Sequence, residues 1–193
     1  GWITDPDLTA DDLSALATGQ AAPLPALVSL GRLDGDHLLI DIETAGLLTI
    51  DGDPDAADSA IRSIALQLAT STWVDHVDVL LVGAPSLDIT GADRVRYLSN
   101  LDDAIDELAA VATSITNALD AAEHSSTLQA RCSDQHDDGW IPTILVCTQE
   151  VDAEARERLD EIVGEGNRGV AVVAQSAARA RWHAHVTDNE LAL

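Results

Sequence analysis

The sequence contains no lysine. Its ten basic residues are all arginines and stand against 34 acidic residues, so the chain of 193 residues has a formal net charge of −24 at pH 7. Nucleic-acid binding depends mainly on cationic side chains that displace counterions from phosphates, and a molecule this acidic repels phosphate backbones and anionic membranes. We therefore expect no nucleic-acid partner. The acidity itself indicates either selection for solubility or a basic partner protein.

Long apolar runs, methionine and a cysteine framework are also missing. Hydrophobic residues make up 46% of the chain, but no apolar run approaches the roughly 18 residues that cross a bilayer, so we expect no direct membrane insertion. The chain begins at Gly1 without a signal-like segment, and we interpret Gly1 as an expression remnant on an excised fragment. Cys132 and Cys147 are predicted to be unpaired, which favours a reducing compartment such as the cytoplasm.

Strands and helices alternate along most of the chain. Residues 1–25 are predicted to be a lead-in segment or linker, and residues 26–193 a single domain. Apolar runs on both sides of a turn at 32–36 predict a β-hairpin, and the runs TID, LLVG, LVCT and VVAQ predict central parallel strands. Apolar stripes of helical period follow at 61–68, 101–119 and 155–162. The fold class is therefore α/β, a three-layer sandwich with a mostly parallel sheet and an N-terminal hairpin.

One strand-to-helix junction matches the length of a phosphate-binding loop, GxxxxGK[ST]. In such a loop backbone amides hold the phosphates, the lysine neutralises them and the hydroxyl binds magnesium. Ala57 stands at the second glycine and Asp58 at the lysine, so phosphate would be repelled. Read alone, the segment is an ordinary turn with an aspartate cap on the next helix. The segment reads Gly52-Asp53-Pro54-Asp55-Ala56-Ala57-Asp58-Ser59.

Two later segments resemble the acidic motif and the sensor strand of FtsK/EccC-type P-loop ATPases, and this resemblance implies the roles of their residues. A proline-led strand ends in Gln149 and Glu150, where an aspartate–glutamate pair would anchor magnesium and polarise water. A glycine-flanked strand ends in Gln175, at the place of a polar sensor residue, and Arg168 precedes it. Arg168 is equally typical of a cation that stabilises a helix C-terminus.

Together these segments resemble the FtsK/EccC branch of RecA-like P-loop ATPases over residues 26–186. The resemblance is greatest to degenerate relatives inside larger actinobacterial proteins that also carry LysM or transcriptional-activator modules. It implies a RecA-like sheet and a place in a longer protein, either cytoplasmic or the cytoplasmic part of a membrane-anchored chain. Because the lysine and the magnesium-binding aspartate are absent, we expect no ATPase activity and no cofactor.

The sequence leaves three functions open. We favour a non-catalytic interaction or regulatory module with an unidentified protein partner or self-association. An active or nucleotide-binding ATPase could use Arg62 in place of the lysine, and an unrelated enzyme could use Glu150 at the strand ends. The polar segment 124–139, predicted to be a surface loop, carries His124, Cys132 and His136, but their spacing matches no tetrahedral zinc signature, so we expect no metal.

Overall fold

A computed structural model describes residues 9, 22–33, 36–71, 77–83, 93–133, 140–187 and 190–192. The predicted lead-in at residues 1–25 lies mostly outside these residues, and so do His136 and the end of the predicted loop at 124–139. Within the described part, seven strands form one sheet and two more form a separate hairpin. No described helix is long and apolar enough to cross a membrane.

The large sheet has the strand order β5-β4-β6-β7-β3-β8-β9. Every neighbouring pair is parallel except β8 and β9. The predicted fold class, a mostly parallel sheet with four central strands and an N-terminal hairpin, is therefore confirmed. The strands of the sheet are β3 (Leu47–Gly52), β4 (Asp78–Val82), β5 (Val95–Leu98), β6 (Thr143–Glu150), β7 (Val170–Gln175), β8 (Trp182–Thr187) and β9 (Glu190–Ala192).

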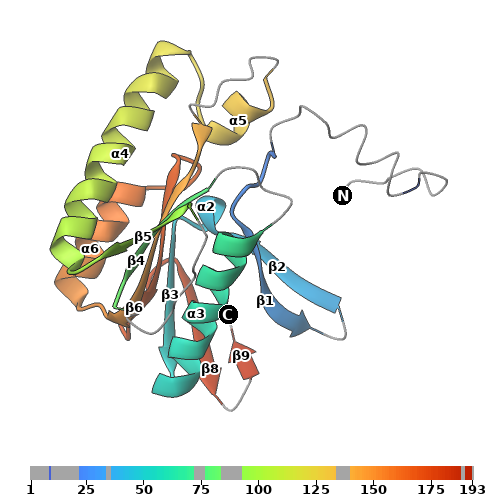
Figure 1. Ribbon diagram of the computed structural model, residues 1–193, viewed down its shortest axis with the longest axis vertical. Coiled ribbons are helices and arrows are strands. Elements are labelled where there is room, and N and C mark those ends of the chain that lie inside the picture. Colours follow the sequence, from blue (N-terminus) through green and yellow to red (C-terminus); the bar gives the residue numbers. More distant parts are fainter. Residues whose placement is uncertain are drawn as a thin grey trace.

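This sheet is the middle one of three layers (Figure 1). The helices α4 and α6 cover one face, while α3 and the hairpin cover the other. The predicted stripe on α3 is buried against the sheet at Ile61, Ile64 and Leu68, because residues three or four apart share one helix face. The remaining elements are β1 (Leu27–Leu33), β2 (Asp36–Asp41), α2 (Ile42–Ala45), α3 (Pro54–Thr70), α4 (Leu101–Ala121), α5 (Thr127–Arg131) and α6 (Ala153–Val163).

Three short elements differ from the sequence predictions, and two of the helices have identifiable caps. The segment predicted as a loop at 124–139 contains α5, and the edge strands β5 and β9 carried no recognisable apolar run. The helix α4 is capped by Asn100, whose side chain accepts a hydrogen bond from the Asp103 N–H at 2.8 Å. The helix α6 is capped by Asp152, whose side chain accepts a hydrogen bond from the Ala155 N–H.

Both cysteines are free thiols, as predicted. Cys132 is exposed in the turn after α5, and Cys147 is buried inside β6. Burial raises the pKa of the Cys147 thiol to about 11. Cys147 therefore acts as a small apolar side chain in the core.

A buried ion pair holds the amino-terminal end of the sheet together. Glu43 in α2 and Arg131 in α5 have side chains only 1% and 5% exposed, and the Arg131 Nη1 to Glu43 Oε2 distance is 2.6 Å. Glu43 also accepts hydrogen bonds from the Thr127 hydroxyl and from the Gly169 N–H. The rest of the guanidinium donates to the carbonyl of Trp140. This network joins four segments that are far apart in the sequence.

Arg131→Met should lower the free energy of unfolding by about 3–5 kcal/mol, because it leaves the Glu43 carboxylate buried without its cation. Urea unfolding followed by circular dichroism measures the loss. Arg158→Met is the matched control, since Arg158 is 44% exposed and its ion pairs within the described part of the chain are with exposed aspartates of α4, and it should change stability by less than about 1 kcal/mol. Equal losses in the two variants would contradict this account of the ion pair.

Candidate functional site

The junction between β3 and α3 is pinned to the neighbouring strand β8. The Asp53 N–H donates to the Val186 carbonyl at 2.9 Å. Gly52 has φ +117°, and a Cβ at this position would lie 2.0 Å from the same carbonyl oxygen. Only glycine tolerates this approach. The first glycine of the motif therefore serves strand packing in this chain.

The N-terminus of α3 is occupied by the chain's own carboxylate. The side chain of Asp53 accepts hydrogen bonds from the N–H groups of Asp55 at 3.1 Å and of Ala56 at 3.0 Å. The Ala57 N–H donates to the Asp53 carbonyl at 2.8 Å, and Pro54 has no N–H to offer. All the amides that a helix start normally leaves free are thus already used.

Residues 52–59 match a phosphate-binding loop in length, but they do not trace one. The helix begins at Pro54, so only Gly52 and Asp53 lie between the strand and the helix. The physical reason is local, because aspartate at the cap followed by proline at the first helical position is a strong helix start. The alternative reading of the sequence, an ordinary turn with an aspartate cap, describes the junction correctly.

The remaining motif residues are ordinary helical residues of α3. Ala57 is fully buried, and Ser59 is exposed. Asp58, at the lysine position, forms an ion pair with Arg62, whose Nε lies 2.5 Å from its Oδ2. Arg62, the candidate replacement for the lysine, is therefore bound to a carboxylate one helical turn away.

The second acidic motif lies two strands away from this junction. Gln149 and Glu150 are exposed at the end of β6, after a register irregularity that pairs Glu150 with Gln175 of β7. Because β7 separates β6 from β3, the two motifs are about 10 Å apart across the sheet. Gln175 lies between them, and its carbonyl accepts a hydrogen bond from the Val151 N–H. The structure thus places Gln149, Glu150 and Gln175 at the same sheet edge as Asp53.

Arg168 is at the opposite edge of the sheet. It precedes β7, which runs six residues from Val170 to Gln175, so about 20 Å of strand separates it from the β3–α3 junction. It is also not a cation of the last turn of α6, which contains no basic residue. Neither predicted role of Arg168, in a nucleotide site or at a helix end, fits its position.

Sequence reasoning missed a polar cluster beside the junction. One oxygen of Asp51 lies 2.5 Å from Nδ1 of His185 and 3.2 Å from Nε2 of His183. The other ring nitrogen of His183 is 2.9 Å from the hydroxyl of Thr49, which is fully buried. The alternation of His183 and His185 places both on one side of β8, but the pairing of β8 with β3, which brings Asp51 between them, is a property of the fold.

The environment of Asp51 favours its ionised form. Burial alone would raise the pKa of this carboxyl, but the hydrogen bond from His185 and the charges of His183, His185 and Arg179 outweigh it and lower the pKa. Among the described residues, no group of three or more histidine, cysteine or acidic side chains is arranged to hold a metal ion. The contacts of Asp51, on β3, with His183 and His185, both on β8, form a clamp between the two strands.

No protein-family model matches the sequence, and no curated protein matches it. Solved structures of similar fold include the following two. The pCW3 conjugation coupling protein TcpA, in its monomer form with ATPγS, is 15% identical with a TM-score of 0.55 over 80% of this chain and 49% of that one. The cytoplasmic domain of the type VII secretion ATPase EccC from Thermomonospora curvata is 19% identical with a TM-score of 0.56, over 83% of this chain and 22% of that one.

These similarities show that the chain shares its α/β fold with these two proteins. At 15% and 19% identity they concern the architecture of the chain. The chain covers less than half of TcpA and less than a quarter of the EccC structure. The region that the three chains share is thus one ATPase-like domain.

Replacing the cap should cost stability without unfolding the domain. Asp53→Ala leaves the Asp55 and Ala56 amides without their acceptor and should lower the free energy of unfolding by about 0.5–2 kcal/mol. Asp53→Asn keeps an acceptor oxygen and should lose only a few tenths of a kcal/mol, about the difference between good caps. Chemical unfolding of the three proteins measures both effects. A loss for Asn as large as for Ala would contradict the capping role.

The Asp51 clamp should make stability sensitive to acid. The pKa of Asp51 is lower in the folded protein than in the unfolded chain. Its contribution to the free energy of unfolding is therefore complete above the unfolded pKa of about 3.9 and is lost as the pH falls through the folded pKa. The stability difference between wild type and Asp51→Asn should therefore be larger at neutral pH than near pH 3. Urea unfolding at both pH values measures it, and a difference independent of pH would contradict the clamp.

Proposed function

We propose that this domain is a non-catalytic interaction or regulatory module derived from a P-loop ATPase. It belongs to a longer protein and works in the cytoplasm, either free or as the cytoplasmic part of a membrane-anchored chain. The observation that carries this proposal is the Asp53 carboxylate bound to the first amides of α3. A phosphate would have to displace this carboxylate from amides that it already satisfies.

Charge also supports a loss of nucleotide binding. Asp58 in place of a lysine changes the local charge by two units, and a unit pair at about 4 Å is worth roughly 4 kcal/mol at an effective dielectric near 20. The helix dipole contributes only about 0.3–1 kcal/mol to anion binding at exposed sites. Attraction by the helix start is therefore too weak to overcome the negative residues around it.

The two rival functions have less support. A substitute cation at Arg62 is engaged by Asp58, so an arginine-based nucleotide site would first have to break that ion pair. An unrelated enzyme at the carboxyl ends of the strands would need a pocket there. A pocket found in the described part of the chain lies instead between β1, α3 and β9.

Calorimetric titration tests the proposal. The wild-type protein should bind ATP, ADP and GTP with magnesium no more tightly than about 1 mM, which corresponds to roughly −4 kcal/mol. Asp58→Lys should still release no phosphate from ATP, because Asp53 remains in the helix start and Gln149 at the expected magnesium position. ATP binding in the micromolar range, or ATP hydrolysis by the Asp58→Lys variant, would contradict the proposal that the domain has lost nucleotide binding and catalysis.

A further inference from the structure

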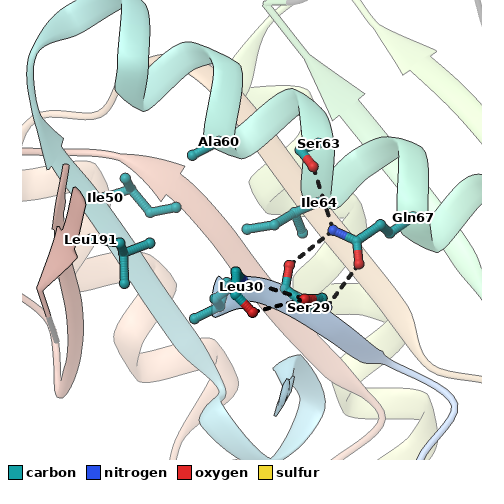
Figure 2. Close-up of a pocket in the computed structure, with 9 residues that line it drawn as sticks. Ser29, Leu30, Ile50, Ala60, Ser63, Ile64, Gln67 and Leu191 are labelled. Carbon is teal, nitrogen blue, oxygen red and sulfur yellow. Dashed lines mark hydrogen bonds between the residues drawn. The ribbon is translucent and has the colours of Figure 1, made fainter. Parts of the chain in front are cut away.

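A pocket of about 270 Å³ lies between the hairpin, α3 and the edge strand β9 (Figure 2). Its apolar lining comes from Leu30 of β1, Ile50 of β3, Ile64 of α3 and Leu191 of β9. Leu30 and Leu191 are only partly buried, so apolar surface remains open to an incoming group. A cavity of about 150 Å³ already accommodates benzene, and this pocket is therefore large enough for a leucine or phenylalanine side chain.

Small residues create the space. Ala60 and Ser63 line the pocket from α3, where larger side chains would fill the space between α3 and β1. On the opposite wall Gly31 has φ +131°, and a Cβ there would meet no atom within 4 Å. Since protein interiors are otherwise packed as densely as organic crystals, the pocket is a distinct feature of this helix–hairpin contact.

The neighbouring edge of β1 is closed to another strand. The side-chain oxygen of Gln67 accepts the Ser29 N–H at 2.8 Å, and its nitrogen donates to the Ser29 carbonyl at 3.0 Å. Figure 2 shows this amide lying against β1. An extended chain cannot form backbone hydrogen bonds at Ser29 while this pair is present. A partner therefore reaches the pocket with a side chain and not by adding a strand to β1.

The uncharged lining of the pocket and the net charge of the chain indicate which kind of partner segment binds. No residue lining the pocket is charged, and inserting an ionised group without a partner is costly. The chain as a whole has a formal charge of −24, so a second copy or an acidic segment is repelled and a cationic segment is attracted. We propose that the pocket receives an apolar side chain from a cationic segment of a partner protein. This inference rests on the interaction function proposed above and names the chemistry of its partner.

Three short fluorescent peptides test the inference. One carries a central leucine between arginine pairs, the second replaces that leucine by glycine, and the third replaces the arginines by glutamates. The arginine–leucine peptide should bind at least about tenfold more tightly than either of the others by fluorescence anisotropy. Equal binding of the glycine peptide would show attraction by charge alone, and equal binding of the glutamate peptide would remove the charge argument; either result overturns the proposal.

Variants locate the binding. Ala60→Leu fills the pocket and should weaken binding of the arginine–leucine peptide about tenfold or more, whereas Ala118→Leu, on the exposed side of α4, should leave it unchanged. Circular dichroism confirms that both variants fold, and amide shifts of the wild type should cluster at Gly31, Ala60 and Leu191. Unchanged binding by Ala60→Leu, or dimerisation of the free protein in sedimentation, contradicts the inference. Neither result affects the nucleotide titration, which tests the loss of ATP binding separately.

Discussion

The Asp53 carboxylate at the start of α3 is the interaction on which the proposed loss of nucleotide binding depends. It supplies from within the chain the negative charge that a bound phosphate would supply, and it uses the amides of Asp55 and Ala56. Its own N–H fixes the junction to β8 through Val186. The hydrogen-bonding groups of the turn therefore have partners within the chain, and the Asp53 carboxylate interacts favourably with the positive end of the helix dipole.

Two polar networks and an apolar core join the elements of the fold. The Glu43–Arg131 ion pair joins α2 and α5 at the N-terminal ends of the parallel strands. Asp51 clamps β3 to β8 near their C-terminal ends. Long apolar strands buried between two layers supply most of the remaining stabilisation. All of these contacts are made by residues of the chain itself.

The sequence predicts the large elements well because each carries its own signal. Apolar runs identify β3, β4, β6 and β7, and a helical stripe identifies α4, whereas β9 has three residues and no pattern to recognise. The Asp53–Pro54 helix start was visible in the sequence, yet the match to a phosphate-binding loop favoured a longer turn. The Asp51 cluster and the position of Arg168 could not be predicted, because both depend on strand order and register rather than on local sequence.

The most direct measurement of the central claim is the response of the amides of Asp55, Ala56 and Ala57 in a two-dimensional ¹H–¹⁵N NMR spectrum as ATP and magnesium are added. Because these amides are already bonded to Asp53, the account predicts no saturable shift at millimolar ATP. Saturable shifts of these three amides, with a dissociation constant below about 1 mM, would contradict it and show that phosphate displaces the internal carboxylate.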